Sequence, residues 1–483
     1  MIGPLTRELV RSCRSGADEL TAGRSRESLL ALAERLAEPR IRIAVGGRMN
    51  AGKSTLVNAL LRQRLAATGA TETTTLVTWF RYGHQDRLRL HLRDGTTRLV
   101  PAAPGGGVPT STTGWNLDPA ELTHITVEAS NSALDTNHTI IDTPGLDSMS
   151  NLDEASLAAL AHADAVLYLM PHPGEKDAEA VEAVRAWSGS THFTTASIVG
   201  VLSRIDTLSA GGEDPWPAAQ RVARRYGEDL ASSFSEVLPV SGLIAETALG
   251  GEFSESDTRA ITTLRATDPF DLEDALSSAD AFLEWSDSPI AALTRRRLVA
   301  LLGMYGLRAA VDLVEQGNTS TRSLLAGLRR LSGIDALLER VRRDFVVDAD
   351  RLRATAAMAT IRDLPWTTSP SEARVLQRVR ADVDQLCLHP AMRQVGLHGA
   401  LSDVRSGLLQ LDPADVEQLE SLAGGHDLRS CLGLGPTAAE DEVGRTADAY
   451  IDRWRTLEMR PSRRLRRHAR AARELCEQML FAS

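Results

Sequence analysis

Eight consecutive residues have the types and the spacing of a phosphate-binding loop. They follow the pattern G-x-x-x-x-G-K-[ST] and are Gly47, Arg48, Met49, Asn50, Ala51, Gly52, Lys53 and Ser54. Residues 41–46 before the loop form an apolar run of strand length, and residues 55–62 after it have apolar side chains at helical spacing. A strand that turns through glycines into a helix directs backbone N–H groups at an anion. The pattern therefore predicts nucleotide binding, with Lys53 on the β- and γ-phosphates and the Ser54 hydroxyl on Mg²⁺.

The use of lysine supports this interpretation over an ordinary glycine-rich turn. The chain has only two lysines, Lys53 and Lys176, so nearly all its positive charge comes from arginine. Lysine is still present at the one position where a compact, rotatable ammonium is needed. The predicted phosphate-binding set is Gly47, Asn50, Ala51, Gly52, Lys53, Ser54 and Thr55.

Two more segments fit a Mg²⁺ and γ-phosphate site. Asp142-Thr143-Pro144-Gly145 ends an apolar run of strand length. There Asp142 can hold Mg²⁺ through water, and the Gly145 N–H can contact the γ-phosphate. In the threonine-rich stretch 65–75 we predict that Thr74 contacts Mg²⁺ and the attacking water. The neighbouring Thr71, Thr73 and Thr75 are alternatives for that role.

The segment Ser203-Arg204-Ile205-Asp206 predicts the choice of base. The Asp206 carboxylate can accept hydrogen bonds from both N1–H and the N2 amino group of guanine. Adenine has neither donor, and the unpaired carboxylate would then cost about 1–3 kcal/mol. The usual guanine motif has Asn or Thr, then Lys, where this chain has Ser203 and Arg204, and Arg204 could stack on the base. Ser241, Gly242 and Leu243 would present backbone N–H groups to the guanine O6.

The sequence lacks one group that many switch GTPases use to orient water. They have a glutamine directly after the Asp-x-x-Gly motif, and this chain has Leu146 there. Asn50 is the nearest polar candidate for the task. A backbone carbonyl, a monovalent cation or a second subunit are the alternatives.

The pattern around these motifs predicts a P-loop α/β domain over residues 40–288. Residues 88–100 alternate around Asp94-Gly95, which is a strong hairpin signal. The continuous apolar runs 165–170 and 197–202 are typical of strands buried on both faces of a parallel sheet. Further strands are expected at 76–80, 125–129, 139–141 and 237–240.

The two ends of the chain have the periodicity of amphipathic helices. We expect an N-terminal helical arm (neck) at 1–39, an all-α helical stalk at 289–436, and a C-terminal helix at 437–483 that returns to the neck. The predicted fold is thus an α/β P-loop GTPase domain with an all-α neck and stalk.

Composition narrows the class of protein. The 483 residues carry a net charge of -10, which disfavours nucleic-acid binding. The four cysteines (Cys13, Cys387, Cys431, Cys476) are scattered, which favours reduced thiols and no structural zinc. No signal peptide and no apolar run long enough to span a bilayer are evident. We expect a cytoplasmic protein whose membrane contact, if any, is peripheral, at the inner face of the cell membrane.

These motifs together resemble those of bacterial dynamin-like GTPases. Residues 75–83, 201–206 and 301–306 are similar to the isoniazid-inducible actinobacterial group, especially its IniC-type member. The resemblance covers residues 40 to about 310 in its motifs and is architectural beyond them. It implies GTP hydrolysis to GDP with Mg²⁺, a nucleotide-dependent dimer through the GTPase domain or pairing with a longer paralogue, and membrane remodelling. Met49 and Asn50 depart from the Gln and Ser of the wider family, which affects how water is positioned.

Two segments could meet an anionic membrane, and each has a plainer explanation. The bend 364–370 contains Trp366, which would lie at an interface or pack in an interhelical turn. The arginines between Arg460 and Arg473 would attract anionic lipid or pair with acidic helix faces. The rival functions are a ribosome-linked GTPase, which would want a basic RNA-binding appendage, and a non-catalytic GTP-dependent scaffold.

Overall fold

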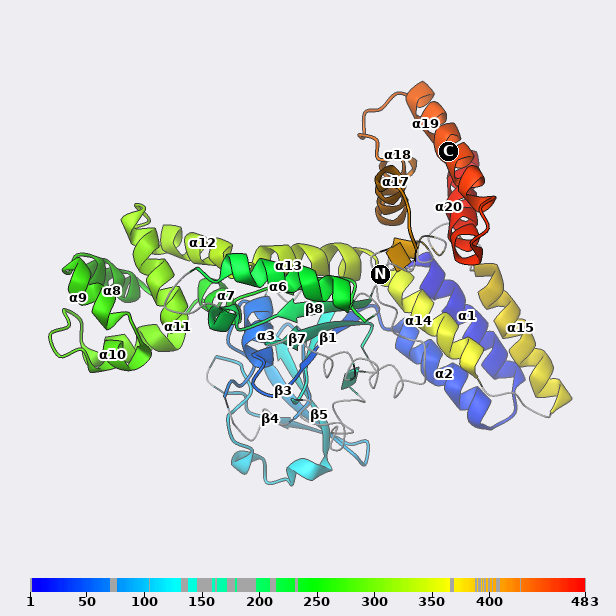
Figure 1. Ribbon diagram of the computed structural model, residues 1–483. Coiled ribbons are helices and arrows are strands. Elements are labelled where there is room, and N and C mark those ends of the chain that lie inside the picture. Colours follow the sequence, from blue (N-terminus) through cyan, green and yellow to red (C-terminus); the bar gives the residue numbers. More distant parts are fainter. Residues whose placement is uncertain are drawn as a thin grey trace.

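The structure is a computed structural model (Figure 1). It describes residues 2–69, 76–103, 105–131, 138–145, 159–160, 163–171, 179, 197–208, 214–230, 233–364, 369–386, 389, 392, 394, 397, 400–401, 403–404, 409–425 and 427–482. Among them, no helix combines the length and the apolarity that crossing a membrane requires.

A sheet of nine described strands carries the phosphate loop. Its order is β4-β3-β5-β2-β6-β1-β7-β8-β9. The strand bounds are β1 Ile41–Gly47, β2 Thr78–Tyr82, β3 Arg87–Leu92, β4 Thr97–Val100, β5 Leu122–Ala129, β6 His138–Asp142, β7 Ala165–Met170, β8 Ile198–Leu202 and β9 Val237–Pro239. The strands from β6 to β9 are parallel to one another, with β1 between β6 and β7. Their carboxyl ends therefore meet at one edge of the sheet, where the predicted motifs follow.

The strand predictions are confirmed with small shifts. β3 and β4 form the expected hairpin, in which Asp94 Oδ1 accepts the Thr96 N–H at 2.8 Å and Gly95 has a φ of 84°. All residues of β7 and β8 are buried, as their continuous apolar runs predicted. The strand expected at 76–80 begins at Thr78 instead, while the Val77 carbonyl accepts a hydrogen bond from the Ile125 N–H.

Helices cover both faces of the sheet. On one face lie α3 (Lys53–Leu61) and α7 (Gly242–Leu249), together with α13 (Ile334–Arg340) and the π-helix η6 (Val341–Val347). On the other face lies α6 (Trp216–Asp229). The sequence placed the boundary between the GTPase domain and the stalk at residues 288 and 289. Ile334, Leu337 and Phe345 lie beyond that boundary, yet they pack in the same apolar core as β1.

A helical unit extends from α7 away from the sheet (Figure 1). It contains α8 (Glu255–Arg265), α9 (Pro269–Ala275), α10 (Ala279–Glu284), α11 (Ala292–Glu315) and α12 (Thr321–Ser332). Its apolar core joins Ile244 of α7 to Phe282, Leu307 and Leu324. The start of α7, which follows β9 at the predicted base site, is therefore packed against α11.

The N-terminal arm is helical, as predicted, and forms a four-helix bundle. Its helices α1 (Pro4–Glu19) and α2 (Arg24–Ala37) pack on α14 (Ala349–Asp363) and α15 (Pro370–Leu386). The C-terminal helices α19 (Glu440–Glu458) and α20 (Arg463–Ala482) share a separate core with α17 (Pro413–Gly424) and α18 (Leu428–Cys431). The sequence predicted that the last helix packs on the N-terminal arm. In the described residues α14 and α15 fill the core of the arm, and α20 packs on α17, α18 and α19 instead.

Five of the arginines near the C-terminus fall into two groups. Arg464 pairs with Asp403 at 3.6 Å, and Arg470 and Arg473 pair with Glu458 at 2.6 and 2.9 Å. For these three, pairing with acidic helix faces is the observed arrangement. Arg460 and Arg466 are exposed and have no acidic partner among the described residues.

The start of α1 is capped by a carboxylate from a distant helix. Asp350 of α14 accepts the Leu5 and Thr6 N–H groups at 3.0 and 2.9 Å. α1 has no acidic residue in its first turn and no side-chain cap of its own. Asp350 therefore satisfies two free amides and supplies the negative charge that a helix N-terminus favours.

Replacing Asp350 with alanine is expected to destabilise the bundle by about 1–2 kcal/mol, the usual loss for a helix cap. Chemical unfolding followed by circular dichroism would measure this loss. Asp448→Ala, at an exposed position of α19, is the control and should stay within about 0.5 kcal/mol of the parent. Equal stabilities of the two variants would contradict the capping role.

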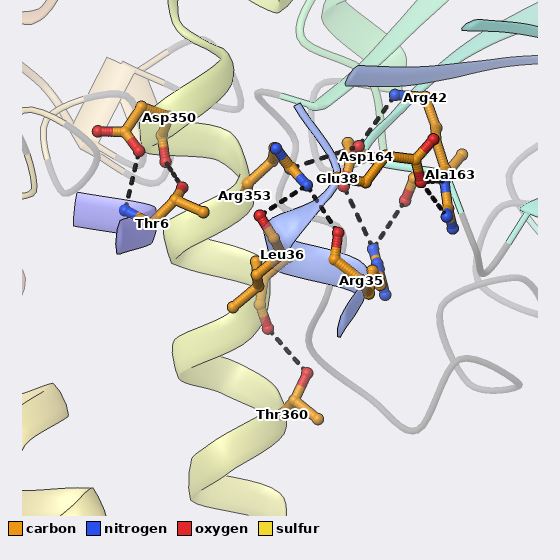
Figure 2. Close-up of polar contacts among 11 residues, drawn as sticks. Thr6, Arg35, Leu36, Glu38, Arg42, Ala163, Asp164, Asp350, Arg353 and Thr360 are labelled. Carbon is orange, nitrogen blue, oxygen red and sulfur yellow. Dashed lines mark hydrogen bonds and ion pairs between the residues drawn. The ribbon is translucent and has the colours of Figure 1, made fainter. Parts of the chain in front are cut away.

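A buried ionic cluster joins this bundle to the sheet (Figure 2). Asp164 precedes β7 and accepts the Arg42 N–H at 2.9 Å, while Arg35 of α2 and Arg353 of α14 lie 3.4 and 3.9 Å from its oxygens. The side chains of Asp164 and Arg353 are only 3% and 5% exposed. Arg353 also donates to the Arg35 carbonyl at 2.8 Å, at the end of α2. Burial lowers the pKa of the Arg353 guanidinium below its ordinary value, and the Asp164 charge opposes that shift.

Candidate nucleotide-binding site

The phosphate loop connects β1 to α3 through backbone conformations that glycine favours. Gly47 has a φ of 139°, and a Cβ there would lie 2.5 Å from the Leu169 carbonyl oxygen. Gly52 has a φ of 92° and is the N-cap of α3. Asn50 adopts a φ of 59°, which is uncommon for a residue other than glycine. The predicted loop geometry therefore has a steric basis at its two fixed glycines.

Lys53 is held across this loop. Its side chain is buried, and Nζ donates to the carbonyl oxygens of Gly47 and Arg48 at 3.2 and 2.9 Å. A lysine ammonium fixed by loop carbonyls is poised to bind an anion above the N–H groups of α3. This arrangement matches the phosphate-binding role predicted for Lys53.

Ser54 and Asp142 come together although they lie far apart in the sequence. The Ser54 hydroxyl donates to Asp142 Oδ2 at 2.7 Å. The other carboxylate oxygen, Oδ1, is buried and has no hydrogen-bond partner among the described residues. A hydroxyl beside a carboxylate with a free buried oxygen suits a hard cation such as Mg²⁺. These residues therefore fit the predicted metal site.

Burial raises the pKa of Asp142 to about 6, although the Ser54 hydrogen bond and the Lys53 charge oppose this shift. The folded pKa lies above the ordinary value of 3.8. In the nucleotide-free protein, ionised Asp142 therefore lowers the stability of the folded state. This loss of stability grows as the pH rises from about 4 to about 6.

We expect Mg²⁺-dependent nucleotide binding to weaken as the pH falls through about 6, because protons then compete with Mg²⁺ for Asp142. Calorimetric titrations with GTP at about pH 5 and pH 7, with and without Mg²⁺, would measure this. Asp142→Asn should remove the Mg²⁺-dependent difference. An equal loss of affinity at low pH without Mg²⁺ would assign the effect to another group.

The segment after Asp142 lies directly against the phosphate loop. Thr143 is buried, and its hydroxyl donates to the Val45 carbonyl at 2.9 Å. A Cβ at Gly145 would lie 2.7 Å from Met49 Cα, so only glycine fits this close approach. Gly145 therefore lies beside the loop, in keeping with its predicted contact to the γ-phosphate.

A pocket of about 280 Å³ brings the predicted base-binding residues together. Four separate segments line it: the loop with the start of α3, the end of β7, the end of β8 with the residues after it, and residues 240–243 at the start of α7. The lining residues are Ala51, Gly52, Thr55, Leu56, Leu169, Val201, Ser203, Arg204, Asp206, Thr207, Val240, Ser241, Gly242 and Leu243. Every residue predicted for the base, and Thr55 with them, is present in this set.

Local geometry at this pocket explains part of the unusual motif. Ser203 is buried, and within the part of the chain that the structure describes its hydroxyl has no hydrogen-bond partner. Arg204 is exposed with a φ of 49°, and its carbonyl accepts the Thr207 hydroxyl at 2.8 Å. Asp206 is also exposed, so its carboxylate is accessible to a ligand. Sequence reasoning missed Thr207, although it directly follows a predicted residue.

Several predicted residues lie outside the part of the chain that the structure describes. They are Thr74 with its alternatives Thr71, Thr73 and Thr75, Leu146 at the place of the water-orienting glutamine, and Trp366 of the bend at 364–370. Their roles remain predictions. Asn50 is described and exposed in the phosphate loop, and its role in orienting water also remains a prediction.

Comparison with known proteins adds independent evidence. Residues 43–188 match the model of the dynamin family. Isoniazid-induced protein IniC of Mycobacterium tuberculosis is 32% identical over 441 residues, which cover 88% of this chain and 86% of that protein. Dynamin-like protein A of Bacillus subtilis is 28% identical over 202 residues, which cover 42% of this chain and 16% of that protein.

Two further likenesses cover less or align less well. Isoniazid-induced protein IniA of Mycobacterium tuberculosis is 32% identical over 139 residues, which cover 28% of this chain and 22% of that protein. A solved structure of an oligomerised bacterial dynamin pair covers 83% of this chain and 79% of its own at 16% identity, and its TM-score of 0.33 is too low to compare individual elements. The near full-length match to IniC and the family model agree with the fold and with the motifs. This chain therefore belongs to the dynamin family, among the bacterial dynamin-like proteins similar to IniC.

Proposed function

We propose that this protein is a Mg²⁺-dependent GTPase that hydrolyses GTP to GDP and phosphate. The observation that carries the proposal is the meeting of three groups at one edge of the sheet. These are the loop with Lys53, the Ser54–Asp142 pair, and the pocket lined by Asp206. Along the sheet, Asp142 ends β6, the loop follows β1 and the base residues follow β8, which is the order of metal, phosphates and base expected for one bound nucleotide.

Each group has a defined task in this proposal. Lys53 and the N–H groups at the start of α3 stabilise the negative charge that develops on the phosphates. Ser54 and Asp142, with Thr74, would hold Mg²⁺, which neutralises phosphate charge when bound. The Gly145 N–H contacts the γ-phosphate, and Asn50 orients the attacking water.

We expect the base preference to reverse when one carboxylate oxygen of Asp206 is replaced by an amide nitrogen, as in Asp206→Asn. Guanine offers two donors to the carboxylate, whereas xanthine has a carbonyl at C2 in place of the amino group. An asparagine amide pairs with xanthine, because its N–H₂ donates to that carbonyl and its oxygen accepts N1–H. Asp206→Asn should therefore weaken GTP binding by about tenfold or more and strengthen xanthosine triphosphate binding.

Competition titrations with GTP, ATP and xanthosine triphosphate test this proposal. The parent protein should prefer GTP, and the Asp206→Asn variant should prefer xanthosine triphosphate. Equal competition by ATP and GTP in the parent protein would refute the guanine assignment. Phosphate release from GTP, measured on the same samples, separates a GTPase from a scaffold that only binds nucleotide.

The proposal extends to assembly and membranes. The protein would act in the cytoplasm as a nucleotide-dependent dimer through its GTPase domain, or paired with a paralogous dynamin-like protein. It would work peripherally at the inner face of the membrane in membrane remodelling or maintenance. Family membership supports this extension, as do the exposed Arg460 and Arg466, which suit anionic lipid.

Co-sedimentation with anionic vesicles, with and without a non-hydrolysable GTP analogue, tests the membrane part. Pelleting that requires nucleotide, and that Arg460→Ala with Arg466→Ala abolishes, would support direct contact. If the folded protein stays in the supernatant in both states, its membrane contact must be made by a partner.

A further inference from the structure

The helices α3 and α7 form two walls of the base pocket. Thr55 and Leu56 line it from α3, and Gly242 and Leu243 line it from α7. The two helices pack side by side (Figure 1), and a Cβ built at Gly242 would lie 3.8 Å from Thr55 Cγ2. In the proposed site the start of α3 binds the phosphates and the start of α7 binds the guanine O6. One nucleotide must therefore reach both helices at once.

A buried hydrogen bond joins the two helices one turn beyond the pocket. Asn58 lies one turn after Ser54 on α3, and Glu246 lies one turn after Gly242 on α7. The Asn58 amide donates to Glu246 Oε1 at 2.9 Å, and both side chains are buried. Residues one turn apart lie on the same face of a helix, so this bond connects the faces that carry the two ends of the site.

Further contacts hold both partners of this bond in place. Asn58 Oδ1 accepts the backbone N–H groups of residues 65 and 66 at 3.0 and 2.8 Å. Arg64 Nε donates to Glu246 Oε1 at 3.0 Å, and the same guanidinium pairs with Glu252 at 2.9 Å. Burial raises the pKa of Glu246, and the Arg64 charge and the Asn58 hydrogen bond oppose that shift. Neither side chain can turn away without losing several hydrogen bonds.

This polar link does what apolar packing between α3 and α7 does not do. The hydrophobic effect has no preferred direction, so apolar contacts alone do not set one position along the helix axes. A hydrogen bond between buried groups is directional, and leaving it unmade is unfavourable. The Asn58–Glu246 bond therefore fixes the register of the two helices, and with it the width of the pocket between Thr55 and Gly242.

From this geometry we infer that Asn58 and Glu246 are positioning residues, which hold the phosphate-binding start of α3 and the base-binding start of α7 at the spacing of one nucleotide. The inference rests on the proposed nucleotide site and adds two residues outside its motifs. Neither of them lines the pocket. Breaking the link should weaken binding of the whole nucleotide and spare a ligand that reaches only the phosphate loop.

Glu246→Met removes the link without leaving a buried charge, because the Asn58 amide also donates to the Ala66 carbonyl and Arg64 keeps Glu252 as its partner. Calorimetry with Mg²⁺ compares the affinities for a non-hydrolysable GTP analogue and for inorganic triphosphate, which lacks the base and the ribose. We expect the analogue to bind about tenfold more weakly and inorganic triphosphate to stay within about twofold of the parent value. KM for GTP should rise about tenfold, with kcat within about threefold of the parent value.

Exchanging the two functional groups tests the hydrogen bond itself. Asn58→Asp alone places a second carboxylate beside Glu246, and binding of the GTP analogue should weaken at least as much as in Glu246→Met. Adding Glu246→Gln restores a donor and an acceptor in the opposite order, so the double variant should return to within about threefold of the parent affinity. A double variant that binds no better than Asn58→Asp would contradict the inference. These variants decide the question if Glu246→Met does not fold.

A matched control separates positioning from general loss of stability. Asp415, 2% exposed, lies 2.6 Å from Arg453 in the separate core of the C-terminal helices, and Arg453 also pairs with Asp412. Asp415→Leu should lower the thermal unfolding temperature and leave both affinities at the parent values. Equal losses for the two ligands in Glu246→Met, or no loss for either, would overturn the inference. A parent protein that binds the GTP analogue no more tightly than inorganic triphosphate would instead refute the proposed function.

Discussion

Replacing Lys53 with alanine is expected to reduce GTP turnover by about 10²–10³-fold, the usual effect of removing one preorganised donor to developing charge. The physical reason is its position. Nζ is held by the Gly47 and Arg48 carbonyl oxygens within the phosphate loop. Arginine, which supplies nearly all other positive charge in the chain, is planar and longer.

Lys53→Arg is the matched control for charge. It should also lose most activity, because the guanidinium cannot occupy the compact space between the two carbonyl oxygens. Phosphate release under saturating GTP measures turnover, and thermal unfolding confirms that both variants fold. Undiminished turnover in a folded Lys53→Ala protein would remove the catalytic role assigned to this residue.

Breaking the buried ionic cluster between sheet and bundle is expected to have the largest effect on stability. Arg353→Met leaves the buried Asp164 with fewer cations, and such losses cost about 3–5 kcal/mol. Asp164→Asn keeps an acceptor for the Arg42 N–H and leaves two arginines, Arg35 and Arg353, without their carboxylate. Both changes should lower the stability of the junction between the bundle and the sheet.

Denaturant unfolding and limited proteolysis of the junction would measure this loss. An exposed pair supplies the matched control, because Arg225 and Asp229 are 77% and 54% exposed. Arg225→Met should cost less than about 1 kcal/mol. The double variant Asp164→Asn with Arg353→Met should lose less than the sum of the single losses, since the residues share one interaction. Strict additivity would show that the two side chains act independently.

The sequence determined the local chemistry of this protein. Its phosphate loop, the hairpin at Asp94-Gly95, the buried strands β7 and β8 and the N-terminal helices were predictable, because each depends on neighbouring residues and a short repeat. The grouping of Ser203, Asp206 and Ser241 around one pocket was predictable as well, since the carboxyl ends of parallel strands meet at one edge. Where a motif and its flanking element agree, residue type alone fixes both the local backbone and its chemistry.

Only the tertiary structure decided which helices pack together. Amphipathic periodicity shows that a helix has an apolar face and says nothing of the partner, so the pairing of α1 and α2 with α14 and α15 was not predictable. The same holds for Asp350 on α1 and for Asp164 between three arginines. Each joins residues far apart in the chain, and contacts at such separation depend on packing that no local pattern encodes.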